Sequence, residues 1–96
     1  MTPPAVVLAS ADAVVIRAVS ASFEEEGVPL IVVAPCTYRE AAIRSPLGIG
    51  LAHGDGQLLV GLSTGPDAPY VIGDDPRRMG CIAARLAARR PLGAGA

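Results

Sequence analysis

Lysine and tryptophan are absent from the sequence, histidine occurs once, and cysteine occurs twice among the 96 residues. Without lysine there is no Schiff-base residue and no phosphate-binding P-loop. Cys36 and Cys81 form no CxxC pair, and His53 alone does not complete a zinc ligand set with them. One phenylalanine, two tyrosines and a formal net charge of −1 lack the stacking rings and basic excess of a nucleic-acid surface. We therefore expect no zinc centre and no nucleic-acid partner.

Long hydrophobic runs are also missing. None approaches the ~20 residues needed to cross a bilayer, and the first basic residue, Arg17, comes too late for a signal peptide. The sequence thus predicts a cytoplasmic protein without a membrane partner. In that reducing compartment we expect Cys36 and Cys81 to be buried or half-buried thiols, although their spacing does not exclude a disulfide.

The composition is apolar for so short a chain. Hydrophobic residues make up 51% of the 96 residues and charged residues 18%, and the length predicts a single domain, 1–96. A chain of this length buries only about 60–65% of the surface that it exposes when unfolded. So much apolar surface indicates either a well-covered α/β sheet or a subunit with a large interface.

Short β-branched runs alternate with amphipathic stretches along the chain. Strands are predicted at 4–9, 28–34, 47–52, 57–62 and 69–72, and helices from Ser10 or Asp12 to Glu26, at 37–44, and from Pro76 to a stop at Pro91 before a loose tail, 92–96. The apolar stripes of the first and last helices comprise Val15, Ile16, Val19 and Phe23, and Met79, Ile82, Ala83 and Leu86. The order β-α-β-α-β-β-β-α predicts a three-layer α/β/α domain with a mixed five-stranded sheet, one strand of which is antiparallel. The strand at 28–34 is expected to be buried.

Three carboxylates, Glu24, Glu25 and Glu26, lie in the last turn of the first predicted helix, directly before the stop at Gly27. The helix dipole is negative there, so each carboxylate costs a few tenths to about 1 kcal/mol. Glutamates that oppose the helix dipole, with no stabilising partner nearby in the sequence, indicate a functional role. The competing interpretation is a surface helix end that tolerates the charge for solubility.

Catalytic patterns are not found. The glycines near 48–56 do not follow GxGxxG, and His53 and Gly56 form only part of a cobalamin-binding DxHxxG pattern, because Leu51 occupies the aspartate position. Adjacent glutamates on a helix point about 100° apart and do not converge on one substrate. One of them could give a single oxygen ligand to Mg²⁺ held elsewhere. We therefore expect no enzyme activity in this chain.

Four segments in register resemble a known family. They are 23–29 (FEEEGVP), 44–50 (RSPLGIG), 68–72 (APYVI) and 80–86 (GCIAARL). They are similar to the small subunit of the diol/glycerol dehydratase-reactivating factor, and the medium subunit of the dehydratase itself is similar through the same segments. The resemblance implies the three-layer, anticodon-binding-domain-like fold of these dehydratase-associated subunits, in agreement with the order of elements.

The resemblance also implies a role. The reactivating factor is a chaperone-like assembly whose large subunit hydrolyses ATP and which releases damaged cobalamin from adenosylcobalamin-dependent dehydratase by subunit exchange. It implies that Glu24, Glu25 and Glu26 lie at the large subunit, with Glu25 as a Mg²⁺ ligand shared with that subunit. ATP or ADP then belongs to the partner, and this chain alone binds no cofactor and has no catalytic residue.

Two other interpretations stay open at this point: a medium-subunit-like component of the dehydratase, and a stand-alone small α/β module that binds a ligand. The sequence does not distinguish a glycerol from a propanediol dehydratase as the client. It also leaves the stoichiometry and an association with a bacterial microcompartment undecided.

Overall fold

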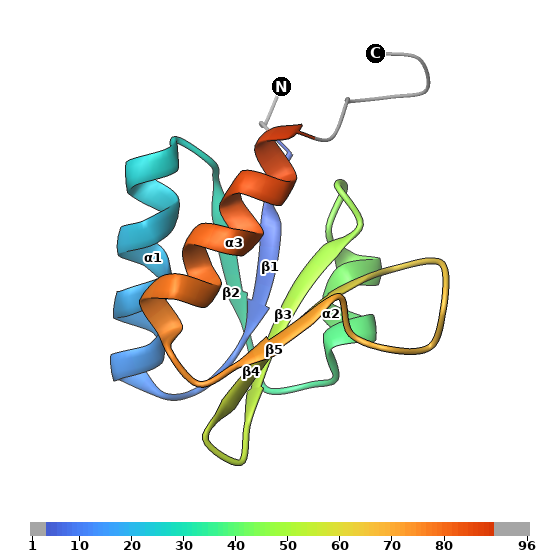
Figure 1. Ribbon diagram of the computed structural model, residues 1–96, viewed down its shortest axis with the longest axis horizontal. Helices are drawn as coiled ribbons and strands as arrows, with labels where there is room; N and C mark the ends of the chain where they lie inside the picture. The colour runs from blue at the N-terminus through green and yellow to red at the C-terminus, as the bar shows by residue number, and fades with distance from the viewer. Residues whose placement is uncertain (1–3, 90–96) are drawn as a thin grey trace.

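The computed structural model describes residues 4–89, which form one sheet and three helices (Figure 1). The elements are β1 (Val6–Ala9), α1 (Ala13–Glu26), β2 (Leu30–Val33), α2 (Tyr38–Arg44), β3 (Ile49–Gly54), β4 (Gln57–Leu62), β5 (Val71–Gly73) and α3 (Pro76–Arg89). The predicted order is confirmed. The predictions for Arg90, Pro91 and 92–96 lie outside the described residues. No helix within 4–89 is long and apolar enough to span a membrane.

The five strands lie in the order β2-β1-β3-β4-β5. β1 pairs in parallel with β2 and with β3, so that Leu8 lies between Val32 and Leu51. β4 is antiparallel to both of its neighbours, β3 and β5. One strand therefore runs against the other four, as the sequence predicts. All four residues of β1 are buried, which places this strand at the centre of the domain.

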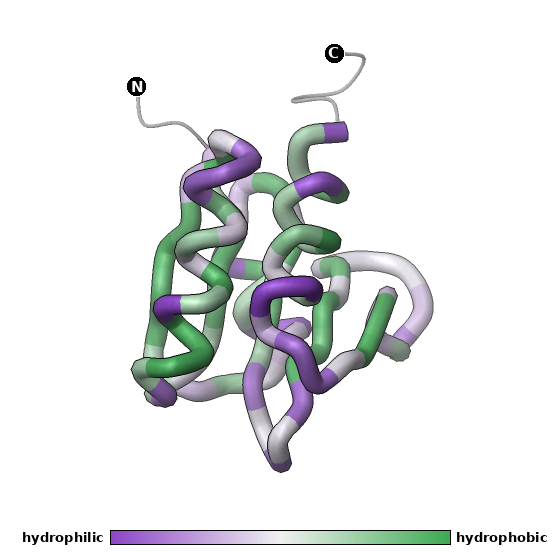
Figure 2. Tube along the Cα trace, turned by 60° about the vertical axis from the view of Figure 1, so that its left-hand side comes forward, coloured by the Kyte–Doolittle hydropathy of each residue, from purple (hydrophilic) through white to green (hydrophobic). Residues whose placement is uncertain are grey.

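The main core lies between the sheet and the helices α1 and α3, which pack side by side on one face (Figure 1). Val19 and Phe23 of α1 and Met79 of α3 are buried against the strands. The helices approach closely at Gly80, where a Cβ atom would lie 2.9 Å from the Ser22 Cβ. Figure 2 shows the hydrophobic residues along the strands and the hydrophilic ones on outer helix turns and at the tip of the β3–β4 hairpin.

The third layer is α2, which packs on the opposite face with its backbone almost against the sheet. A Cβ atom at Gly50 would overlap the Ala42 backbone nitrogen and lie 2.7 Å from the Tyr38 carbonyl oxygen. Glycine at position 50 therefore allows this helix to lie directly against β3. Thr37 and Glu40 form a capping box that begins α2.

Local sequence signals fix the ends of the other elements. Asp12, and not Ser10, caps α1 by accepting hydrogen bonds from the Val14 and Val15 backbone N–H groups at 2.9 and 3.1 Å. Gly27 ends α1 in the left-handed conformation, with a φ of 72°. Asp55 and Gly56 both have positive φ and form the two-residue turn between β3 and β4.

The prediction of a buried strand at 28–34 is wrong. β2 is shorter and lies at the edge of the sheet, where Ile31 and Val32 are 48% and 41% exposed. Part of β2 stays exposed because α2 is only seven residues long and packs on β1, β3 and β4. An apolar run looks the same in a central strand and at an uncovered edge.

Candidate functional site: an acidic corner and an apolar groove

The acidic corner comprises Glu24, Glu25 and Glu26 in the last turn of α1. Glu24 and Glu25 are exposed, and Glu26 is partly buried. Phe23 precedes them and is anchored in the core, which fixes the direction of this last turn. The predicted site residues therefore lie together on the surface, where a second polypeptide can reach them.

Two arginines of α3 pair with the acidic corner. Arg77 Nη2 donates to Glu25 Oε1, and Arg85 Nε donates to Glu26 Oε2 at 3.4 Å. The prediction that these carboxylates have no stabilising partner within the chain is therefore wrong. Their partners are arginines of α3, which lie far away in the sequence. These pairs are largely exposed, so each is worth about 0–1 kcal/mol, roughly what the helix dipole costs.

The pairing leaves acceptors for another ligand. Only Oε1 of Glu25 contacts Arg77, and Glu24 makes no ion pair or side-chain hydrogen bond with the rest of 4–89. No group of three His, Cys, Asp or Glu side chains within that range could hold a metal ion. The acidic corner therefore fits a single-oxygen contribution to Mg²⁺, with the remaining ligands supplied from outside this chain. Glu25 as that ligand stays a prediction.

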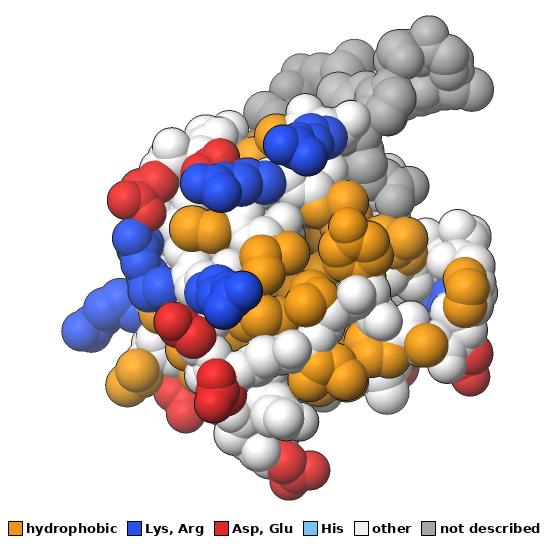
Figure 3. All heavy atoms as spheres, in the orientation of Figure 1, with side chains coloured by type: hydrophobic (Ala, Val, Ile, Leu, Met, Phe, Trp, Pro, Cys, Tyr) orange, Lys and Arg blue, Asp and Glu red, His pale blue; other side chains and the backbone are white. Residues whose placement is uncertain are grey.

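Three shallow hollows of about 340, 310 and 320 Å³ follow one another over the surface. The first lies between β5 and α3, the second between α3 and Tyr70, and the third between Leu62 and the loop that precedes β5. Ile82 lines the first and the second, and Tyr70 lines the second and the third. Figure 3 shows the hydrophobic side chains of this face as a continuous patch, with arginines along its upper and left sides. We call this feature the β5–α3 groove.

The sequence does not predict the β5–α3 groove, although part of the signal is present. The predicted stripe of α3 contained Ile82 and Leu86, yet the buried residues are Met79, Gly80 and three alanines, Ala83, Ala84 and Ala87. The small side chains face the sheet and α1, because Gly80 and the alanines let α3 approach closely. Consequently the larger Ile82 and Leu86 lie at the margin of the core, partly open to solvent.

The remaining candidate residues are the two cysteines and the histidine. Cys36 and Cys81 are free and partly buried, as expected of thiols in a reducing environment. His53 belongs to strand β3, where it pairs with Leu58 of β4. Arg39 of α2 holds the loop that follows β4 by donating to the Pro66 carbonyl oxygen at 2.9 Å.

These residues define a class of protein: a small α/β/α domain whose exposed features are a charged corner and an apolar groove, both suited to polypeptide contacts. The sequence matches no protein-family model and gives no significant match to a curated protein. Among solved structures, it is similar to a chain of the diol dehydratase-reactivating factor complexed with ADP and Mg²⁺, with a TM-score of 0.78 and 27% identity over 96% of this chain and 99% of that chain.

A chain of a glycerol dehydratase reactivase is similar as well, with a TM-score of 0.79 and 28% identity, covering 95% of this chain and 97% of the other. Both alignments span nearly the whole of both chains, so the likeness is one of complete domains of similar length. The resemblance to dehydratase-reactivating factors that the sequence predicts is therefore confirmed.

Proposed function

We propose that this chain is the small, non-catalytic subunit of a reactivating factor for adenosylcobalamin-dependent diol or glycerol dehydratase. The observation that carries the proposal is the end-to-end match to two reactivase chains at TM-scores of 0.78 and 0.79. A match confined to a common sheet core would support the fold alone. Here the loops and all three helices are included, which favours a shared role.

In the proposed mechanism the ATPase activity belongs to a large partner subunit. This chain forms a hetero-oligomer with it in the cytoplasm and takes the place of a dehydratase subunit, so that the dehydratase opens and releases damaged cobalamin. The ADP and Mg²⁺ of the similar diol dehydratase-reactivating factor support a nucleotide and metal site on the partner. Glu25 would give that Mg²⁺ one carboxylate oxygen ligand.

The test is a reactivation assay with purified components. Dehydratase is first inactivated in the presence of glycerol, and its activity is then followed after addition of ATP, Mg²⁺ and adenosylcobalamin. We expect recovery only when both this chain and the large subunit are present. Recovery with the large subunit alone would contradict the proposal.

The same components separate the alternatives. A medium-subunit-like protein would restore activity when combined with the other dehydratase subunits in the absence of the ATPase. A stand-alone module would remain a monomer and bind a small molecule without any of these partners. Either result would replace the proposed function.

A further inference from the structure

The loop 63–70 joins β4 to β5 and projects from the sheet beside α2 (Figure 1). A backbone hydrogen bond holds each of its ends. The Ser63 N–H donates to the Gly48 carbonyl oxygen at 2.9 Å. The Tyr70 N–H donates to the Val60 carbonyl oxygen at 2.7 Å. The middle of the loop is exposed, so its position depends on what holds it between these two anchors.

One side chain supplies the hydrogen bonds that reach the middle of the loop from the rest of residues 4–89. Arg39 Nη2 donates to the Pro66 carbonyl oxygen at 2.9 Å and to the Gly65 carbonyl oxygen at 3.4 Å. The same nitrogen lies 3.5 Å from Asp67 Oδ1, on a side chain that is 99% exposed, whereas the Arg39 side chain is 24% exposed. A charged donor strengthens a hydrogen bond to a carbonyl, while an ion pair open to water contributes little. The Pro66 carbonyl is therefore the main acceptor.

The first turn of α2 is a fixed base for this arginine. The capping box of Thr37 and Glu40 orders the turn. The ring of Tyr38 lies on the backbone of β4 at Gly61, where a Cβ atom would overlap the ring. Arg39 follows directly, so it extends to the loop from a turn that is already packed against β4.

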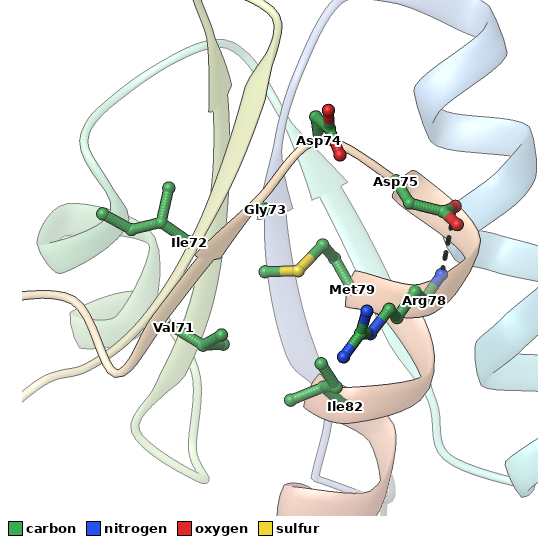
Figure 4. Close-up of a pocket in the computed structure, with 8 residues that line it drawn as sticks. All are labelled: Val71, Ile72, Gly73, Asp74, Asp75, Arg78, Met79 and Ile82. Atoms are coloured by element: carbon green, nitrogen blue, oxygen red, sulfur yellow. Dashed lines mark hydrogen bonds between the residues drawn. The ribbon is translucent and has the colours of Figure 1, made fainter.

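The loop in turn shapes the third hollow. All six residues that line this hollow lie between Leu62 and Tyr70, and Pro66 is one of them. By contrast, the first hollow is lined by β5, α3 and the turn between them (Figure 4). The form of the third hollow thus depends on the contact that Arg39 makes, and the form of the first does not.

We propose that Arg39 is a latch that sets the balance between two states of the loop 63–70. In the latched state the guanidinium holds the Pro66 carbonyl and the third hollow is formed. In the released state the loop moves between its two backbone anchors and the hollow is lost, while the sheet and α2 stay in place. The latch is a property of this chain alone and does not depend on the proposed function.

Matched variants of the full chain test the latch. Arg39→Met removes the guanidinium and keeps an aliphatic stem. Arg44→Met is the control, because Arg44 ends the same helix, is exposed and forms no ion pair within residues 4–89. Asp67→Asn removes the ion pair and leaves the carbonyl contacts. Urea unfolding checks that each variant folds, and Arg39→Gln is the substitute if Arg39→Met does not.

We expect the loop of the unaltered chain to be ordered, with backbone NMR order parameters of about 0.8 at Gly65 and Ala68. In Arg39→Met these values should fall below about 0.6. Cleavage within 63–70 by a broad-specificity protease, mapped by mass spectrometry, should become about tenfold faster. Arg44→Met and Asp67→Asn should change that rate less than about threefold.

Three results would overturn the latch. One is a loop that is already mobile in the unaltered chain, and another is an unchanged loop in Arg39→Met. The third is an equal release in Arg44→Met, which would assign the effect to the charge of α2. If Asp67→Asn releases the loop as fully as Arg39→Met, the ion pair replaces the Pro66 carbonyl as the holding contact and the proposal fails in that form. The reactivation assay tests the proposed function separately.

Discussion

Gly50 is the residue at which the sheet and α2 approach most closely. The alanine methyl group of Gly50→Ala would overlap the Ala42 backbone nitrogen and lie 2.8 Å from the Ala41 carbonyl carbon. Backbone cannot rotate away as a side chain can, so α2 must shift. We expect a loss of about 1–3 kcal/mol in the free energy of unfolding, measured by urea denaturation.

Gly54, four residues further along the same strand, is the control. A Cβ atom there would meet nothing within 4 Å. Gly54→Ala should be neutral or stabilise the protein by up to about 1 kcal/mol, because alanine restricts the unfolded chain. Equal losses at both glycines would show that the contact with α2 is not the cause.

Glu25 has two roles that substitution can separate: an ion pair with Arg77 and the predicted Mg²⁺ ligand. Glu25→Gln removes both, whereas Arg77→Gln removes the ion pair and leaves the carboxylate. If Glu25 ligates the metal, Mg²⁺ should strengthen association of the large subunit with the Arg77→Gln variant and not with the Glu25→Gln variant. The measurement is the Kd with and without Mg²⁺.

The stability of the isolated chain gives the companion measurement. Each variant should lose less than about 1 kcal/mol, because the pair is exposed. If Mg²⁺ strengthens binding of the Glu25→Gln variant as much as that of the unaltered chain, Glu25 is not the ligand, and the acidic corner then contributes charge only.

The helix α3 depends on its first turn, because it has to present both the arginine partners and one wall of the groove. Asp75 Oδ1 accepts from the Arg77 and Arg78 backbone N–H groups at 3.1 and 3.4 Å. Asp75→Ala should therefore cost about 1 kcal/mol in unfolding free energy. Asp74→Ala should cost less than about 0.5 kcal/mol, since Asp74 makes no such hydrogen bond among the described residues. Chemical denaturation of the two variants decides, and an equal cost for both would contradict a capping role confined to Asp75.

The elements themselves could be predicted, because their signals are local. The stop at Gly27 and a cap at Ser10 or Asp12 each depend on a residue or two whose backbone preferences are strong, and Asp12 is the one that caps α1. The apolar run at 4–9 predicted a strand, and all four residues of β1 are buried. Strand ends were less certain: β3 begins at Ile49, two residues later than predicted, because Gly48 adopts a positive φ of 71° in the preceding turn.

Features that depend on packing between distant segments could not be predicted. The pair of Glu25 with Arg77 joins residues 52 positions apart, and the exposure of Ile31 depends on how far α2 extends across the sheet. The buried Ser22 is a further case, since its hydroxyl donates to the Arg77 carbonyl oxygen at 2.7 Å where α1 meets α3. Of the candidate site, the sequence predicted the acidic corner and missed its arginines and the groove.

Within residues 4–89 the edge strands β2 and β5 each pair with one strand only. Binding of a partner to the folded chain should therefore change its stability. A partner that binds only the folded chain adds about 2.7 kcal/mol when its free concentration is 100 times its Kd. We expect protease resistance of this chain in urea to increase on addition of the large subunit. Addition of an equal amount of an unrelated protein is the control, and an unchanged urea midpoint would argue against a partner that favours the folded chain.

The position of α3 after all five strands has a consequence for biosynthesis. While the chain emerges from the ribosome, the face formed by Leu8, Leu51 and Val60 has no complete cover until Ala83 and Ala87 have been translated. Nascent chains thus expose a hydrophobic surface to water through most of their translation. A stall before α3 is translated leaves a product that is prone to aggregate. Synthesis close to the large subunit, from adjoining reading frames, would shorten that vulnerable interval.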